Sequence, residues 1–522
     1  MLPPPILRPL VYGIKVTSLL LALIGGLVSA FAFPGFGPGL LIVPGIALVL
    51  WGLRSANSRL HGMFIGAIYA FSFFTTVMWW SIELGLIALI PLAVVQSLYF
   101  WFFGWWLAGH RKASPGLWAG YAVGVWALTE LIRYHFPFSG LEWGGAGYAL
   151  SRLAPVRAGA ALIGTSGWTV LIVGVAATLV IAVRAMFGRE PWSWWLLVPL
   201  AAPALVIAAA LGLQVAVATD VGEPTPVAIV QGSTPCPYEK CPPDERLRTF
   251  QQHLELTGEI EPGSVDLVVW AEGSTGSFNA DPVQNEEVGE AIGAEARRIG
   301  AWFLVGSDRP ISGENWINAN VVFDDNGDFV GEYQKQQGVP FGEYIPFRPL
   351  FDWIPDLSQV PRDMVPGDGP VVFELPGFGL GSVISFEGSF ARYARQHVRA
   401  GADVLVVATN EGSYDRTPVS DQLIGMTRMR AAELGVPVIH SAVTGKSVVI
   451  DHEGQLSSEI SGLGSSEIIY GSVQPANSTT FYSLTGDLLM YLAVASILFA
   501  TWRQRRLLAS TTRRGEIDVR RS

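Results

Sequence analysis

Seven long apolar segments occupy the first 219 residues, and they constrain the fold more than any other feature of the sequence. A helix needs about 20 mostly apolar residues to cross the hydrocarbon core of a bilayer, and each segment is near that length. An eighth segment follows close to the carboxyl end. We therefore predict about eight membrane-spanning helices, at residues 9–29, 38–54, 61–82, 85–109, 116–134, 158–184, 194–218 and 484–502.

The composition agrees with a membrane protein. Half of the residues are hydrophobic, only 15% are charged and the mean hydropathy is +0.37. This balance is too apolar for an ordinary soluble protein, and the 18 tryptophans suit the aromatic belts found at bilayer surfaces. The net charge of −10 gives no indication of a nucleic-acid partner.

The positions of basic residues predict the orientation. Lys and Arg are concentrated in alternate loops and in the tail, and such loops usually face the cytoplasm. The N-terminus and the tail are then cytoplasmic, and seven crossings place the following domain outside. We expect a membrane domain at 1–220, an extracytoplasmic domain at 221–482, an eighth helix at 483–503 and a basic tail at 504–522. The basic loop residues are Arg8 and Lys15, Arg54 and Arg59, Arg111 and Lys112, and Arg184 and Arg189.

The extracytoplasmic domain has short Val/Ile/Leu-rich runs that alternate with helix-like stretches. Continuous apolar runs of this kind are typical of strands buried on both faces, in an α/β architecture. We expect chemistry at the carboxyl ends of such strands. The predicted strands are 227–232, 266–274, 301–308, 319–324, 379–387, 402–412, 437–443 and 446–451, and the predicted helices are 283–299, 388–400 and 418–434.

Three of these strands or the loops after them carry candidate catalytic residues. Glu272 follows the run VVWA, and Ser385-Phe386-Glu387 follows GSVI. Lys335 and Glu343 lie in EYQKQQGVPFGEYIPF, after the ANVVFD strand. Taken singly, a strand-end Glu is more often a helix cap or an ion-pair partner, and a lone Lys is usually solvated. No zinc-ligand spacing is present, so we predict neither a metal nor a cofactor.

The order Glu, Lys and then a nucleophile position resembles the nitrilase, or carbon–nitrogen hydrolase, superfamily. The run from Lys335 to Pro346 closely resembles its membrane-anchored branch, the apolipoprotein N-acyltransferases. Eight spans, with the large domain between the seventh and the eighth, also fit that branch, and the resemblance covers nearly the whole chain. Further matching positions are Trp126, Glu130, Arg133, Gly147-Tyr148, Asn318, Asn410, Gln422-Leu423, residues 426–437, Thr444-Gly445-Lys446-Ser447 and Thr485-Gly486-Asp487.

The resemblance implies a nitrilase-like αββα sandwich on a base of about eight helices, in a bacterial plasma membrane. It also implies transfer of a fatty acyl chain from a phospholipid to the N-terminal diacylglyceryl-cysteine of a lipoprotein, through a covalent acyl-enzyme. Glu272 matches the general base and Lys335 the residue that stabilises the oxyanion. Glu343 and Glu387 match supporting carboxylates. We expect a monomer with phospholipid and lipoprotein as its partners.

The sequence departs from this family at the nucleophile. Position 385 carries Ser where the family has Cys, and Phe386 replaces a Tyr. Ser385 could act as an oxygen nucleophile, activated by Glu272 or paired with Lys335. Alternatively, the chain is impaired or altered in specificity and only binds lipid or lipoprotein. A third interpretation supplies the thiol from Cys236 or Cys241, which could equally form a disulfide.

Two other functional classes are disfavoured. The pattern G-x-S-x-G of an α/β-hydrolase is absent around Ser385, which argues against an ordinary lipase. An ionisable residue within a span, Glu130, is compatible with a transporter. However, the large external domain and the lack of paired repeats argue against transport, and we expect Glu130 to form a structural pair with Arg133.

Overall fold

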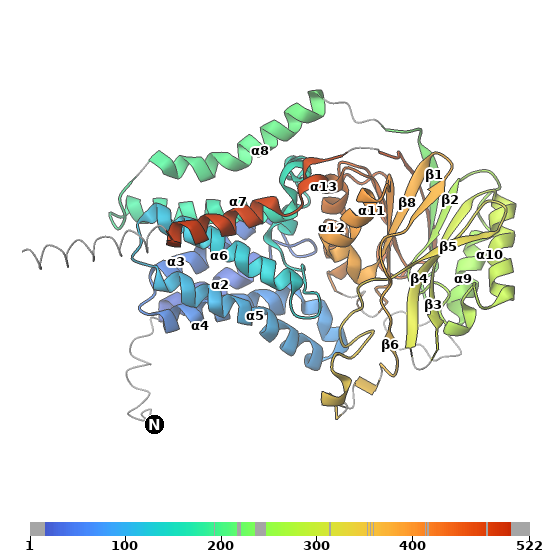
Figure 1. Ribbon diagram of the computed structural model, residues 1–522, viewed down its shortest axis with the longest axis horizontal. Helices are drawn as coiled ribbons and strands as arrows, with labels where there is room; N and C mark the ends of the chain where they lie inside the picture. Colours follow the sequence, from blue (N-terminus) through green and yellow to red (C-terminus); the bar gives the residue numbers. More distant parts are fainter. Residues whose placement is uncertain are drawn as a thin grey trace, which may run out of the picture.

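The protein consists of a helical bundle and an α/β domain that lie side by side (Figure 1). The computed structural model describes residues 16–502, apart from 193, 217–220, 235–246, 313–314, 352, 355–356, 359, 413, 415–416 and 477–478. Cys236 and Cys241 therefore lie outside the described residues, as do the first seven residues of the predicted span 9–29 and the predicted tail.

A helix is present at each predicted apolar segment. Four helices are long and apolar enough to cross a membrane, and shorter apolar helices lie at Val16–Ala30, Gly39–Arg54 and Leu488–Trp502. The predicted span 61–82 is too long, because its helix ends at Val77 and a 3-10 turn, Trp79–Leu84, follows. The helices are α2 (Val16–Ala30), α3 (Ile42–Arg54), α4 (Arg59–Val77), α5 (Leu86–Gly109), α6 (Pro115–His135), α7 (Ala154–Met186), α8 (Leu197–Ala216) and Leu488–Trp502.

The expected structural pair within α6 is confirmed. Arg133 Nη2 lies 2.5 Å from Glu130 Oε2, and both side chains are buried. Arg133 also donates to the carbonyl oxygens of Leu141 and Trp143, at 2.8 and 2.7 Å. A buried charge of either sign is costly unless it is paired and hydrogen-bonded, and here the pair fixes the polypeptide that leaves α6.

Two mixed β-sheets form the centre of the α/β domain. In the first, the order is β12-β1-β2-β3-β4-β5 with β6 beside β4, and in the second it is β11-β10-β9-β8-β7. β1, β2 and β3 are parallel, as are β8, β9 and β10. The strands of the first sheet are β1 (Thr225–Gln231), β2 (Leu267–Trp270), β3 (Trp302–Pro310), β4 (Asn315–Phe323), β5 (Phe329–Gln334), β6 (Asp363–Met364) and β12 (Glu467–Val473). Those of the second are β7 (Val372–Leu375), β8 (Phe378–Ile384), β9 (Val404–Thr409), β10 (Val438–Ala442) and β11 (Val448–Ile450).

The two sheets pack face to face and helices cover their outer faces. Apolar side chains from both sheets, such as Val269 and Val406, share one buried cluster. The outer face of the first sheet packs on α9 (Leu247–Thr257) and α10 (Glu286–Ile299). The outer face of the second packs on α11 (Ala391–Arg399) and α12 (Val419–Leu434). These layers confirm the predicted αββα sandwich.

Helix α12 joins the sandwich to the bundle. Of its 16 residues, 14 are buried. Leu423 and Met426 belong to the apolar core of the bundle, whereas Leu434 belongs to that of the sandwich. Gln422 accepts a hydrogen bond from Trp143 Nε1 at 2.7 Å and donates one to the Val77 carbonyl at 3.1 Å. The two parts of the molecule therefore share a continuous packed interface.

Candidate functional site

Glu272 lies just beyond the end of β2, next to a close approach of β3. A Cβ atom at Gly306 would lie 2.2 Å from the carbonyl oxygen of Ala271 and 2.6 Å from Cα of Glu272. Any residue other than glycine at position 306 would therefore displace backbone atoms. Glycine at position 306 of β3 thus allows the backbone of Glu272 to lie close against this strand.

Lys335 lies directly after β5 and its side chain is fully buried. Its Nζ is 3.0 Å from Glu272 Oε1 and 2.7 Å from Glu343 Oε1. Burial alone lowers the pKa of a lysine, but the carboxylates of Glu272 and Glu343 outweigh it and raise the pKa of Lys335 above its ordinary value. The ammonium group therefore stays charged across the physiological range.

A tight turn and an amide hold the two carboxylates. Val339 N–H donates to Glu343 Oε2 at 2.7 Å, within the VPFGEY segment. Asn318 Nδ2, from β4, donates to Glu272 Oε1 at 2.7 Å and lies 3.4 Å from Glu343 Oε1. Both carboxylates are thus oriented by neutral donors as well as by the lysine.

Ser385 lies at the end of β8, at the start of a 3-10 turn, Ser385–Ser389. Its φ of +51° is in the left-handed region, which a non-glycine residue adopts only when the surroundings impose it. The side chain is half-buried. A sharp turn after a buried strand is a geometry that presents a nucleophile to a substrate.

Glu387 connects the Ser385 turn to the segment that carries Lys335. Its carboxylate accepts from the backbone N–H of Ile384 at 2.8 Å, and from those of Gln336 and Gln337 at 2.6 and 3.0 Å. The Tyr333 hydroxyl also donates to it, at 2.9 Å. Burial raises the pKa of Glu387 to about 7, and the backbone N–H groups limit the rise. Ser385 follows Ile384 and Lys335 precedes Gln336 in the chain. The Glu387 carboxylate therefore holds the backbone next to Ser385 and the backbone next to Lys335 through hydrogen bonds to the same group.

Known proteins resemble both halves of the chain. The model of the apolipoprotein N-acyltransferase N-terminal domain matches residues 25–178, and that of carbon–nitrogen hydrolases matches 226–481. An apolipoprotein N-acyltransferase of Geobacter metallireducens is 26% identical over 493 residues, covering 91% of this chain and 93% of its own. That of Mycolicibacterium smegmatis is 28% identical, covering 82% and 75%. The chain belongs to the apolipoprotein N-acyltransferase family.

Several solved structures resemble about half of the chain. An amidase from Nesterenkonia sp. is 17% identical and covers 50% of this chain and 95% of its own, with a TM-score of 0.37. A carbon–nitrogen hydrolase from Helicobacter pylori is also 17% identical and covers 48% and 88%, with a TM-score of 0.37. The curated family members, in contrast, match across the bundle and the sandwich together.

The residue beside Ser385 packs into the protein. Phe386 is half-buried and meets Phe390 edge to face, with ring centroids 4.8 Å apart. It also contacts the apolar clusters of both the bundle and the sandwich. Phe386 therefore supports the turn at the junction of the two halves, and it brings no polar atom to the site.

Two site residues were not singled out from the sequence. Asp308 on β3 stands opposite Asn318 in the β3–β4 register, and its Oδ1 is buried with no hydrogen-bond partner in the described part of the chain. Burial raises the pKa of Asp308 to about 7, and Glu272 and Glu343 add to the rise. From the sequence, the GSDRP run predicts only the end of a strand. Asp308 could have been recognised as a site residue only from the pairing of β3 with β4, which places it opposite Asn318.

Tyr414 is the second, and it connects the site to the bundle. Burial raises its pKa to about 12, and the charges of Glu343 and Glu272 contribute. Its ring meets Trp80 edge to face, with centroids 5.3 Å apart, and Trp80 in turn lies 5.0 Å from Trp143. An aromatic path therefore leads from the carboxylate–lysine cluster to the membrane bundle.

Proposed function

We propose that this protein is an acyltransferase that moves a fatty acyl chain from a phospholipid to the N-terminal amino group of a diacylglyceryl-cysteine on a lipoprotein. The observation that carries the proposal is the buried cluster of Lys335, Glu272 and Glu343, next to aromatic residues of an apolar bundle. The family's named members support the same activity. An impaired, binding-only protein is disfavoured, because the curated relatives that match nearly the whole chain are named as acyltransferases.

The first half-reaction forms an acyl-enzyme at Ser385. Its Oγ attacks the ester carbonyl carbon of the phospholipid while the hydroxyl proton passes to Glu272. The C–O bond to glycerol then breaks, and the lysophospholipid leaves with the proton from Glu272. The product is an oxyester on Ser385, and Glu272 is a carboxylate again.

The second half-reaction forms an amide. The amino group of the diacylglyceryl-cysteine attacks the oxyester carbonyl and gives a proton to Glu272. The bond to Ser385 Oγ breaks, and the oxygen recovers the proton from Glu272. An oxyester is a poorer acyl donor to an amine than a thioester, so positioning by the site contributes more to this step than in relatives that use a thiol.

Lys335 acts on the oxyanion and not on the Ser385 proton. Its pKa lies above the ordinary value, so it carries no free lone pair with which to accept a proton. A fixed positive charge in a poorly hydrated site stabilises a developing oxyanion strongly. This supports Glu272 as the base over a Ser–Lys pair. Glu343 orients the ammonium, and Glu387 positions the Ser385 turn.

The membrane arrangement extends the proposal. We place about eight spans in a bacterial plasma membrane, with both termini cytoplasmic and residues 221–482 outside, where lipoprotein N-termini are presented. The spans comprise the seven helices of 1–220 and one at 483–503. The four long apolar helices, the three shorter ones and α6 together support this count, and the basic loop residues support the orientation. The protein acts as a monomer.

The test uses a strain that depends on a regulated copy of its own N-acyltransferase. The full chain and its Ser385→Ala and Ser385→Cys variants are expressed after that copy is switched off, and lipoprotein N-terminal peptides are analysed by mass spectrometry. We expect an additional acyl chain with the unaltered protein and none with Ser385→Ala. The control Ser312→Ala alters an exposed serine at the β3–β4 turn and leaves acylation unchanged.

Two results would contradict the proposal. Acylation that is equal in the unaltered protein and in the Ser385→Ala variant excludes this residue as the nucleophile and leaves Cys236 and Cys241 as the candidates. Acylation that appears only with Ser385→Cys means that the natural protein is inactive. Membrane extraction and immunodetection of each variant confirm equal expression.

A further inference from the structure

Asp308 lies on the face of β3 that is directed at Glu272 and at the second sheet. Leu304 on this face belongs to the apolar cluster that both sheets share. A Cβ at Gly306 would point at Cα of Glu272, 2.6 Å away. Because alternate residues of a strand share a face, Asp308 continues the row of Leu304 and Gly306 towards the strand end.

The intervening residues of β3 point to the opposite face. Ser307 Oγ donates to Asp281 Oδ2 at 3.0 Å, and Arg309 Nη1 lies 3.6 Å from Asp281 Oδ1. Arg309 Nη2 also lies 2.5 Å from Glu332 Oε1. The guanidinium next to Asp308 in the chain is therefore engaged with carboxylates on the other side of the sheet.

Asn318 stands opposite Asp308 in the β3–β4 register and is only 2% exposed. Directly opposite residues point to the same face, with Cβ atoms about 5 Å apart. The Asn318 amide nitrogen lies 2.7 Å from Glu272 Oε1 and 3.4 Å from Glu343 Oε1. Only the nitrogen side of an amide can face two carboxylates. Asn318 Oδ1 is thus directed away from them.

Two acceptor oxygens at this point have no donor. Asp308 Oδ1 and Asn318 Oδ1 are both buried, and neither has a hydrogen-bond partner among the described residues. Buried acceptors are costly to leave unpaired. Beside them, Glu272 and Glu343 share Lys335, which sets two negative charges against one positive charge. The site therefore requires a donor, and a positively charged one fits it best.

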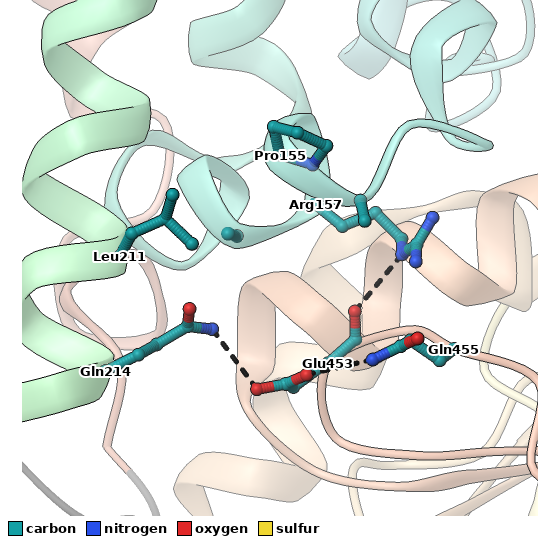
Figure 2. Close-up of a pocket in the computed structure, with 8 residues that line it drawn as sticks. Pro155, Arg157, Leu211, Gln214, Glu453 and Gln455 are labelled. Atoms are coloured by element: carbon teal, nitrogen blue, oxygen red, sulfur yellow. Dashed lines mark hydrogen bonds between the residues drawn. The ribbon is translucent and has the colours of Figure 1, made fainter.

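The cavity between α7 and α8 shows the contrast (Figure 2). Its volume is about 150 Å³, and it is lined by one arginine and one glutamate. Arg157 Nε donates to the Glu453 carbonyl at 3.2 Å, and Gln214 Nε2 donates to Glu453 Oε1 at 3.5 Å. None of its lining side chains has a buried polar atom without a partner in the described part of the chain. That cavity requires no charged ligand, whereas the Asp308–Asn318 pair does.

A primary ammonium group has the properties of the missing donor. It carries one positive charge and three N–H groups, enough for both oxygens. The α-amino group of a polypeptide has a pKa of about 7.7–8.0, so it is mostly protonated at neutral pH. The ethanolamine headgroup of a phospholipid is also an ammonium, but a phosphate and a glycerol separate it from the ester that reacts. Asn318 binds the proposed base Glu272 itself, so a cation at this point is the reacting group.

We propose that Asp308 and Asn318 bind the α-ammonium group of the acceptor's N-terminal cysteine, and that the Asp308 carboxylate accepts the proton that this group must lose before it attacks. One N–H bond breaks, the nitrogen keeps the electron pair, and the proton passes to Asp308. The neutral amine then attacks the oxyester on Ser385 and gives its second proton to Glu272. Asp308 is half-buried and returns its proton to water. The inference rests on the proposed acyl transfer.

The proton affinity of Asp308 suits this role. Burial raises its pKa to about 7; the charges of Glu272, Glu343 and Asp281 add to the rise, and Lys335 opposes it. An α-ammonium group has a pKa within about one unit of this value. Proton transfer between the two groups is therefore close to balanced, which is the condition for efficient acid–base catalysis.

The first test compares the two half-reactions of the detergent-purified full chain. Release of labelled lysophospholipid measures the first, and transfer to a synthetic diacylglyceryl-cysteine peptide measures the second. We expect Asp308→Asn to raise the KM for the peptide about tenfold beyond any effect on the first half-reaction, because a charge-assisted contact is lost. Asp308→Glu keeps a carboxylate and recovers part of the loss. Asp325→Asn, at an exposed position in the β4–β5 turn, alters neither half-reaction.

The second test measures binding without turnover. In a Ser385→Ala background, native mass spectrometry compares the peptide with its N-acetylated form, which has no ammonium group. Adding Asp308→Asn should weaken binding of the free peptide about tenfold and leave the acetylated one unchanged. Hydroxylamine is uncharged at neutral pH and needs no such proton acceptor, so Asp308→Asn should slow its attack on the acyl-enzyme less than that of the peptide.

Three results would overturn the inference. One is an unchanged KM and unchanged peptide binding in Asp308→Asn. Another is equal weakening for the free and the acetylated peptide, which indicates a structural role. The third is a slower first half-reaction with phosphatidylethanolamine but not with phosphatidylglycerol, because the headgroup then occupies the site. If the unaltered protein releases no lysophospholipid, the proposed function fails, and the binding comparison still decides the role of Asp308.

Discussion

Two buried ionic clusters in this protein differ in their balance of charge. At the junction of bundle and sandwich, Arg430 Nη1 lies 2.7 Å from Glu433 Oε1, and Glu433 Oε2 accepts from Thr165 N–H and Oγ1 at 3.0 and 2.8 Å. This is a one-to-one pair whose remaining contacts are neutral. At the candidate site, one lysine faces two carboxylates, and Asp308 stands beside them.

The difference separates a structural role from a chemical one. The one-to-one pair, with Thr165 as its neutral donor, fixes α12 against α7. A cluster with more carboxylates than cations has groups whose proton affinities are pushed apart, which is the arrangement that acid–base catalysis requires. Changing one group at a time in each cluster tests this distinction.

The largest effect is expected at the junction. Arg430→Met leaves Glu433 buried without its counter-charge and lowers the free energy of unfolding by about 3–5 kcal/mol. Thermal unfolding of the purified full chain in detergent measures the loss. The double variant Arg430→Met/Glu433→Leu recovers most of it, because both charges are then absent. A double variant as unstable as the single one would show that the pair is not balanced.

Lys335→Met is expected to slow turnover and also to destabilise the fold, because Glu272 and Glu343 both lose their counter-charge. Loss of the oxyanion-stabilising charge slows acyl transfer about 10²- to 10³-fold, which corresponds to about 3–4 kcal/mol. Release of labelled lysophospholipid in a detergent assay gives the rate. The control Lys446→Met removes a lysine whose ion pair with Asp421, at 2.9 Å, is partly exposed. A similar loss of rate in both variants would contradict a special role for Lys335.

Asp308→Asn should change the dependence of stability on pH. The pKa of Asp308 is about 7 in the folded protein and near its ordinary value of 3.8 when unfolded. The unfolded chain therefore ionises first, and the stability present below about pH 4 is lost as the pH rises to about 7. Thermal midpoints across this window should fall less in Asp308→Asn.

Glu387 titrates in the same window, so part of the slope remains in that variant. Asp325→Asn, at an exposed position in the β4–β5 turn, leaves the slope unchanged. An identical slope in all three proteins would mean that Asp308 does not ionise differently on folding.

The smallest expected effect comes from the close approach behind Glu272. Gly306→Ala pushes against the backbone of Ala271 and Glu272 and costs about 1–3 kcal/mol of folding stability. Acyl transfer should fall as well, because Glu272 is displaced. Gly369→Ala adds the same methyl group where no atom lies within 4 Å. Equal stability and rate in the two variants would exclude this contact as a determinant of the site.

The sequence predicts the interior of the fold better than its edges. The eight strands expected from apolar runs correspond to β1–β4 and β8–β11. The strands β5, β7 and β12 were not expected, because they lie at or near sheet edges and mix exposed with buried residues. An edge strand is covered on one side only and loses the continuous apolar pattern.

The candidate site divides in the same way. Glu272, Lys335, Glu343 and Glu387 follow strands or lie in a Pro/Gly-rich loop, so local patterns and the family motif identify them. Asp308 reaches the site only because β3 pairs with β4 in one register, which no local pattern encodes. The left-handed backbone of Ser385 is likewise imposed by packing around the turn.

Helix α12 makes the bundle and the sandwich depend on each other for folding. One family model ends at residue 178 and the other begins at 226. The two halves nevertheless share an interface, because α12 supplies buried residues to both. A sandwich expressed without the bundle would present the Leu423 and Met426 face to water and should aggregate. The same helix contacts the turn that begins at Ser385, so the candidate nucleophile keeps one position relative to the bundle.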